Sequence, residues 1–167
     1  MKILGLGGWS GAGKTTLLSK LIPELIRRGV TVSTMKHAHH GFDVDQPGKD
    51  SYVHRQAGAT EVLIASEKRW ALMHETRQAS EPSAAELARR MSPVDLLLVE
   101  GFKREPHDKL EIYRAGNNKP LLSADDPTYV AILSDTAVND TNLPVIDLND
   151  IAGIADFIVR HCGLKTR

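Results

Sequence analysis

Cysteine is nearly absent from this sequence, since Cys162 is the single thiol in the chain. A lone cysteine has no internal disulfide partner, so we expect a protein of a reducing compartment. Charge of one sign is not in excess either, because 21 Lys and Arg residues balance 21 Asp and Glu residues. A chain without net charge lacks the basic field of nucleic-acid-binding and anionic-membrane-binding domains. We therefore expect neither nucleic acid nor membrane among its partners.

Long apolar runs are also missing, and none approaches the roughly 20 residues that a membrane-spanning helix needs. The first residues reach several glycines and Lys14 too soon for the apolar core and cleavage site of an export signal. These absences predict a cytoplasmic location. The 167 residues fit a single domain, which we expect over residues 1–167, because two halves would each be short of core.

Short apolar runs alternate with segments of helical periodicity. Residues 94–100, Val-Asp-Leu-Leu-Leu-Val-Glu, are dense enough in apolar side chains to form a central strand buried on both faces. Other strands are expected at 2–8, 30–35, 62–65, 71–74, 110–113, 130–133 and 144–148, and the main helices at 14–28, 49–57, 84–91 and 151–161. This alternation predicts a layered α/β fold with a mainly parallel central sheet flanked by helices.

A phosphate-binding pattern lies directly after the first predicted strand. Residues 8–15 read Gly-Trp-Ser-Gly-Ala-Gly-Lys-Thr, which fits the P-loop pattern G-x-x-x-x-G-K-[ST] without a mismatch. Its glycines let backbone N–H groups point at phosphate oxygens, Lys14 supplies charge to the β- and γ-phosphates, and the Thr15 hydroxyl ligates magnesium. Strand and helix flank the motif as its chemistry requires, so we expect a P-loop NTPase-type fold. The nucleotide-binding candidates here are Gly8, Trp9, Ser10, Gly11, Ala12, Gly13, Lys14, Thr15 and Thr16, with packing of Trp9 against the sheet as the alternative.

A carboxylate is needed on the other side of the magnesium ion, at the end of a neighbouring strand. Glu100 ends the most hydrophobic strand and is followed by Gly101, which lets the backbone turn away. We therefore expect Glu100 to be a metal ligand, and a glutamate that merely faces solvent is the alternative.

The polar segment 36–50 follows the second predicted strand and so belongs to the nucleotide side of a parallel sheet. Lys36 and His37 are candidates for phosphate contacts. The aspartates are candidates for orienting an attacking water or for reaching magnesium; they are Asp43, Asp45 and Asp50, with Asp45 expected as a metal ligand. The histidines His37, His39 and His40 are equally able to ligate a transition metal, and a solvated loop explains the same composition.

At these residues the chain resembles the molybdopterin-guanine dinucleotide biosynthesis adaptor proteins (MobB). The matching segments are Gly-Trp-Ser-Gly-Ala-Gly-Lys-Thr-Thr-Leu at 8–17, Phe-Asp-Val-Asp-Gln-Pro-Gly-Lys-Asp-Ser at 42–51 and Leu-Val-Glu-Gly-Phe-Lys at 98–103. The resemblance implies GTP with magnesium, at most weak GTPase activity and a homodimer. It implies an adaptor role beside the molybdenum cofactor guanylyltransferase, which attaches GMP to molybdopterin. Molybdopterin itself and molybdenum-insertion proteins are further partners of such an adaptor.

Guanine preference follows from this resemblance more than from any motif. The Asn- or Thr-Lys-x-Asp sequence with which GTPases usually read the base is not found. Asp135, just after the predicted strand 130–133, is the nearest substitute, because its carboxylate accepts hydrogen bonds that guanine donates and adenine does not. Two other functions remain open, namely a metal-insertion GTPase that uses the histidines and a small-molecule kinase.

Overall fold

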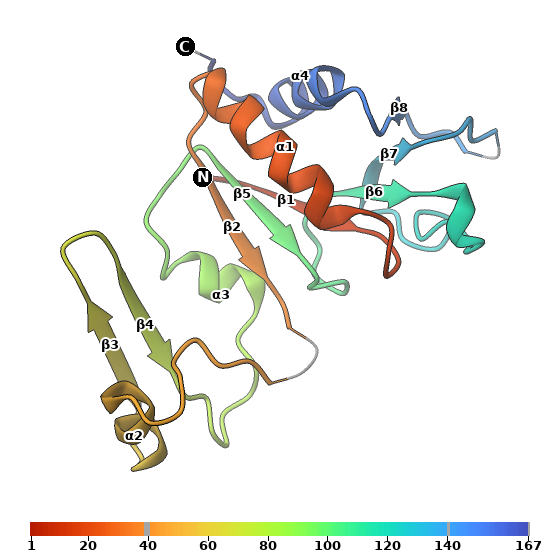
Figure 1. Ribbon diagram of the computed structural model, residues 1–167. Coiled ribbons are helices and arrows are strands. Elements are labelled where there is room, and N and C mark those ends of the chain that lie inside the picture. Colours follow the sequence, from red (N-terminus) through yellow and green to blue (C-terminus); the bar gives the residue numbers. More distant parts are fainter. Residues whose placement is uncertain (39–40, 140, 167) are drawn as a thin grey trace. The chain divides into compact units, whose positions relative to one another are not determined.

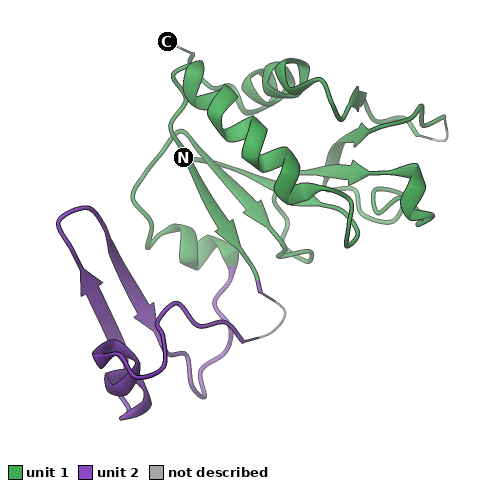
Figure 2. Ribbon diagram, viewed as in Figure 1, with its two compact units in different colours: residues 1–37, 84–167 green, residues 38–83 purple. Residues whose placement is uncertain are grey.

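The computed structural model describes residues 1–38, 41–139 and 141–166. It divides the chain into two compact units (Figure 2). Unit 1 comprises Met1–His37 and Ala84–Arg167, and unit 2 comprises Ala38–Ser83. Unit 2 is therefore an insertion into the sequence of unit 1. Over the described residues, no helix is both long enough and apolar enough to cross a membrane.

Unit 1 is built on a six-stranded sheet with the order β2-β5-β1-β6-β7-β8. Every pairing between its neighbouring strands is parallel, so the carboxyl ends of the strands meet at one edge. This confirms the expected α/β fold with a parallel central sheet and flanking helices (Figure 1). The strands are β1 (Lys2–Gly7), β2 (Val32–Lys36), β5 (Leu96–Glu100), β6 (Lys109–Tyr113), β7 (Tyr129–Ser134) and β8 (Val145–Asp147).

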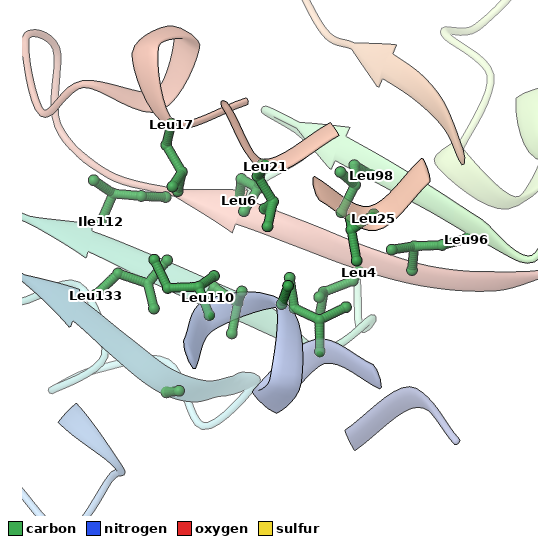
Figure 3. Close-up of a cluster of buried hydrophobic side chains, with 14 of the residues drawn as sticks. Leu4, Leu6, Leu17, Leu21, Leu25, Leu96, Leu98, Leu110, Ile112 and Leu133 are labelled. Carbon is green, nitrogen blue, oxygen red and sulfur yellow. The ribbon is translucent and has the colours of Figure 1, made fainter. Parts of the chain in front are cut away.

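Helices cover both faces of the sheet. Helices α1 (Lys14–Arg27) and α4 (Ile151–Cys162) pack on one face, and the short α3 (Ala84–Ala88) packs on the other. Leu17, Leu21 and Leu25 recur at helical spacing along α1 and point onto the strands in Figure 3. Complete burial of one such leucine contributes roughly 1.5–3 kcal/mol to folding. The apolar stripe of α1 therefore fixes the helix that begins at Lys14 against the sheet.

Strand β5 is buried on both of its faces, as its dense apolar sequence predicted. Leu96 and Leu98 belong to the core beneath α1 and α4. Leu97 and Val99 belong to the second core, beneath α3. Only its last residue, Glu100, is partly exposed, so the strand delivers a carboxylate to the carboxyl edge of the sheet.

Strand β6 instead buries charged residues on the face that α1 and α4 do not cover. The fully buried Glu111 accepts hydrogen bonds from the backbone N–H groups of Leu122 and Ser123, at 2.7 and 2.9 Å. Lys109 Nζ donates to the Thr128 hydroxyl at 2.6 Å and to a backbone carbonyl. These bonds satisfy the buried charges and hold residues 114–128, which include the 3₁₀ helix η1 (Ala115–Asn117), against the sheet.

Unit 2 consists of α2 (Asp50–Gln56) and a hairpin of two antiparallel strands, β3 (Glu61–Ala65) and β4 (Trp70–His74). The strands expected at 62–65 and 71–74 are thus present, but they pair with each other and not with the main sheet. Leu63 lies opposite Leu72 and Ala65 lies opposite Trp70 on one face of the hairpin. Leu63, Leu72 and Trp70 are 60, 48 and 67% exposed. The hairpin therefore presents an apolar face to solvent.

Arg55 of α2 organises the polar part of unit 2. Its guanidinium donates to both oxygens of Asp45, at 3.1 and 2.8 Å, and to Asp43 at 2.7 Å. It also lies 3.6 Å from the carboxylate of Glu75 and over the ring of Tyr52. The Asp45 side chain is completely buried in this pairing. Hydrogen bonding to Arg55 lowers the pKa of the Asp45 carboxyl below its ordinary value of 3.8.

We expect acid to loosen unit 2 through this ion pair. A carboxyl whose pKa is lower in the folded state contributes stability above its unfolded pKa, near pH 4, and loses it as the pH falls further. Hydrogen-exchange protection of α2 amides is therefore predicted to fall below pH 4 in the wild type. In Asp45→Asn we expect the protection of these amides to be lower at neutral pH and to change less with acid. Glu67→Gln, in the hairpin turn, serves as the exposed control. Parallel pH profiles for wild type and Asp45→Asn would show that another group governs acid stability.

Candidate functional site

The P-loop lies at the carboxyl edge, at the middle of the sheet. β1 ends at Gly7 and α1 begins at Lys14, so residues 8–13 form the connection between them. β1 is flanked by β5 on one side and β6 on the other (Figure 1). Residues that follow these two strands therefore lie beside the loop, as expected for ligand sites of open parallel sheets.

The backbone of the loop has the geometry of an anion site. Gly11 and Gly13 have φ angles of 79° and 95°, in the left-handed region that glycine adopts without a side-chain clash. Gly13 is the N-cap residue of α1, and no side chain accepts a hydrogen bond from the first turn at this cap. The N–H groups of the first helical turn, at the positive end of the helix dipole, thus remain for phosphate oxygens.

Lys14 points back along the loop. Its Nζ donates to the backbone carbonyls of Gly8 at 2.8 Å and Trp9 at 3.1 Å. Burial lowers the pKa of Lys14, Glu100 opposes this effect, and Lys103 and Lys36 add to it. The ammonium therefore shares one electrostatic environment with a carboxylate and two further cations, all at the same edge of the sheet.

Glu100 lies where the sequence placed it, at the end of the strand next to the P-loop strand. It is in register with Leu6 of β1 and with Lys36 of β2. Its backbone carbonyl accepts a hydrogen bond from His37 N at 2.8 Å. The fold thus brings Glu100, Lys36 and the P-loop to adjoining strand ends, with a carboxylate at the same edge as the loop.

The turn after Glu100 is tightly constrained. Gly101 has φ 89°, and a Cβ atom there would lie 2.6 Å from His37 Cβ. Phe102 has φ 46°, which is rare for a bulky residue, and its ring lies 5.0 Å from the His37 ring. Local strain of this kind clusters at ligand sites. The turn therefore fixes the direction in which the chain leaves Glu100.

The opposite side of β1 forms a second half of the site. Arg114 follows β6, Asp135 follows β7 and Asn149 follows β8. Arg114 and Asn149 line a solvent-open hollow, together with Gly13 and Thr16. The two oxygens of Asp135 accept from Arg114 Nη1 at 3.2 Å and from the backbone N–H that follows Arg114 at 3.3 Å. Arg114 and Asn149 were not singled out from sequence, although each lies just after a predicted strand.

Trp9 is tied to the segment that covers β6. Its indole N–H donates to the carbonyl of Pro120 at 2.8 Å, and Lys119 Nζ lies 5.8 Å from its ring centre. These contacts anchor Trp9 to residues 119–120, and the alternative that Trp9 packs against the sheet stays a prediction. A nucleotide contact by Trp9 stays a prediction.

The aspartate candidates all belong to unit 2. Asp45 pairs with Arg55, Asp43 shares the same guanidinium, and Asp50 opens α2. Their catalytic roles, and magnesium binding by Asp45, stay predictions. His39 and His40 lie outside the described residues, and within those residues no group of three or more His, Cys, Asp or Glu side chains is arranged to hold a metal.

The comparison with protein families matches residues 3–135 to the model of molybdopterin guanine dinucleotide synthesis protein B. Two curated relatives, both molybdopterin-guanine dinucleotide biosynthesis adapter proteins, are similar over nearly the whole chain. The one from Escherichia coli is 47% identical, covering 94% of this chain and 91% of its own. The one from Haemophilus influenzae is 44% identical, covering 93% of this chain and 86% of its own.

Solved structures give the same result for the fold. A crystal structure of molybdopterin-guanine biosynthesis protein B superposes with a TM-score of 0.73 at 27% identity, covering 95% of this chain and 99% of the other. Bacillus subtilis MobB superposes with a TM-score of 0.73 at 22% identity, covering 99% of each chain. The second likeness supports the fold alone.

Replacement of Lys14 by alanine is predicted to remove triphosphate binding with little loss of stability. The mutation deletes a charge-assisted donor, and such bonds contribute about 1.5–3 kcal/mol each, so affinity falls at least about 10-fold. Calorimetric titration with magnesium nucleotides measures this loss, and thermal unfolding checks the fold. Lys68→Ala, an exposed lysine of unit 2, is the matched control. Unchanged affinity in Lys14→Ala would refute the assignment of residues 8–15 as the phosphate site.

Proposed function

This chain belongs to the molybdopterin-guanine dinucleotide synthesis protein B (MobB) family, adaptors of molybdopterin-guanine dinucleotide biosynthesis, and we propose that it acts there by binding GTP with magnesium. The observation that carries the proposal is the glycine-rich loop between β1 and α1, with the Glu100 carboxylate at the adjoining strand end. Proteins with this arrangement commonly bind nucleotides through the P-loop. The choice of GTP, the metal and the partners are the proposed part.

The proposed phosphate site uses residues from two strand ends, those of β1 and β2. The backbone N–H groups of residues 8–16 surround the phosphates, and Lys14 neutralises them. Lys36 and His37, at the end of β2, add donors on the side of the γ-phosphate. Support comes from the electrostatic coupling of Lys14 to Lys36 and Lys103. In this proposal the Lys14 ammonium leaves the carbonyls of Gly8 and Trp9 when phosphate binds.

Magnesium fits the donor set beside this loop. The Thr15 hydroxyl is exposed at the start of α1, and Glu100 lies at the end of the neighbouring strand. Hydroxyl and carboxylate oxygens are ligands that magnesium prefers when it also holds nucleotide phosphates. A bound magnesium ion would neutralise phosphate charge there. We propose Thr15 and Glu100 as its ligands.

The proposed partner is the molybdenum cofactor guanylyltransferase, because GMP attachment needs GTP and the adaptor holds GTP. Molybdopterin and molybdenum-insertion proteins are proposed as further partners in the same pathway, and the cytoplasm as its location. Neither a glutamine that orients water nor an arginine finger is recognisable near the P-loop in the sequence. Hydrolysis by the chain alone is accordingly proposed to be weak.

We further propose a homodimer formed through the hairpin of unit 2. Two strands alone are marginally stable in water, and one face of this hairpin exposes Leu63, Leu72 and Trp70. Burial of this face against a second copy removes the apolar surface from water. A self-complementary patch of this kind suits a two-fold interface, where the same residues serve both subunits.

Titration with nucleotides is the experiment that tests the proposed ligand. We expect tighter binding of GTP than of ATP with magnesium, and a loss of the magnesium-dependent part of the affinity in Glu100→Gln. Glu67→Gln, an exposed glutamate of unit 2, controls for the change of charge. Equal binding of ATP, or transfer of its phosphate to a metabolite, would contradict the guanine proposal and favour a kinase.

Sedimentation equilibrium tests the proposed dimer. Leu72→Glu is predicted to weaken self-association at least about 10-fold, because burial of one leucine contributes roughly 1.5–3 kcal/mol and a buried charge adds a penalty. Ile26→Glu changes an isoleucine of α1 that is 57% exposed and should leave the dimer intact. This interface would be excluded if the wild-type protein stays monomeric at a concentration of about 100 micromolar. It would also be excluded if Leu72→Glu forms a dimer with wild-type affinity.

A further inference from the structure

Arg114 connects the two halves of the site. It is the first residue after β6, and β6 is the strand between β1 and β7. A side chain at this position reaches both neighbouring strand ends. Arg114 Nε donates to the carbonyl of Ala12 in the P-loop at 3.1 Å, and its Nη1 donates to Asp135 after β7 at 3.2 Å. One guanidinium thus bridges the phosphate loop and the loop with the candidate base-reading carboxylate.

The same segment fixes the orientation of the Asp135 carboxylate. One oxygen accepts from Arg114 Nη1, and the other accepts from the backbone N–H of Ala115 at 3.3 Å. A carboxylate oxygen has two acceptor directions, so each oxygen retains one for a ligand. Two donors that hold both oxygens leave a planar pair of acceptors whose direction is set before ligand arrives.

Arg114 also borders an open hollow on the surface next to the P-loop. It lines this hollow beside Gly13 and Thr16, on the far side of the P-loop from Glu100. The P-loop has further supports that do not depend on Arg114. Lys14 holds the carbonyls of Gly8 and Trp9, and the Trp9 indole donates to Pro120. Loss of Arg114 therefore leaves the phosphate loop with most of its contacts.

We propose that Arg114 is a positioning residue for base selectivity, which orients Asp135 to accept from guanine N1–H and N2–H and holds it at a fixed distance from the P-loop. This inference rests on the proposed GTP function. A site built to accept hydrogen bonds discriminates strongly against a base that lacks the donors, provided that its acceptors are preorganised. Without the guanidinium the Asp135 side chain keeps only the bond from the Ala115 N–H, so its orientation is no longer fixed and guanine loses its advantage over adenine.

The test compares GTP, ATP and inorganic tripolyphosphate, each with magnesium, by calorimetry on the full chain. In Arg114→Met the ratio of GTP affinity to ATP affinity is predicted to fall at least about 10-fold, as it does in Asp135→Asn. Tripolyphosphate affinity stays within about 3-fold, because phosphate contacts are retained. The double variant Arg114→Met, Asp135→Asn is predicted to be no less selective for GTP than the less selective of the two single variants. Arg27→Met, which removes an arginine that is 71% exposed on α1, leaves all three affinities unchanged.

Three results would overturn the inference. Selectivity retained in Arg114→Met would overturn it alone and leave the GTP proposal intact. A parallel fall of GTP and tripolyphosphate affinity would show that Arg114 only supports the P-loop. A wild-type protein that binds GTP and ATP equally would overturn the GTP proposal together with this inference. Arg114→Gln, which keeps a polar side chain of shorter reach, gives the same readout if the methionine variant unfolds.

Discussion

The parallel alignment of six strands is the constraint on which the site depends. Because every strand of unit 1 points the same way, each strand end delivers its next residues to one edge. The strand that carries the P-loop lies inside the sheet, so it has neighbours on both sides. Phosphate binding needs backbone N–H groups at a helix start, and α1 begins at this edge with its apolar stripe packed on the sheet. The core therefore sets the geometry of the loop.

The two sides of β1 supply different chemistry. On one side β5 and β2 end in Glu100 and Lys36, a carboxylate and an ammonium group in register with each other. On the other side the ends of β6 and β7 bring Arg114 and Asp135 together. Groups of both charges thus follow one another along the edge, as the proposed magnesium nucleotide requires. Such complementarity gives orientation as well as affinity.

Local patterns in the sequence predicted the parts of this site that depend on short-range chemistry. The P-loop is one continuous motif, and the dense apolar run 94–100 identified the buried strand that ends in Glu100. Contacts between distant segments could not be predicted. Arg114 and Ala12 are 102 residues apart, and nothing local marks them as partners. The pairing of β3 with β4 in a separate hairpin was likewise missed, because short apolar runs do not state which strand they join.

Buried charges explain the remaining difference between sequence and structure. Asp45 is an aspartate in a polar loop, which in sequence is typical of a metal ligand. In the structure its side chain is buried against Arg55, ten residues along the chain. Glu111 and Lys109 are charged residues in a buried strand. The backbone N–H groups of Leu122 and Ser123 satisfy Glu111, and the Thr128 hydroxyl accepts from Lys109. A sequence gives the charge of such residues, whereas their partners follow only from the fold.

A crystal structure of the protein with magnesium and a non-hydrolysable GTP analogue tests the central claim most directly. We expect phosphates on the backbone N–H groups of residues 8–16, the metal between Thr15 and Glu100, and the base beside Asp135. An analogue bound away from the P-loop, or a metal held without Glu100, would contradict it.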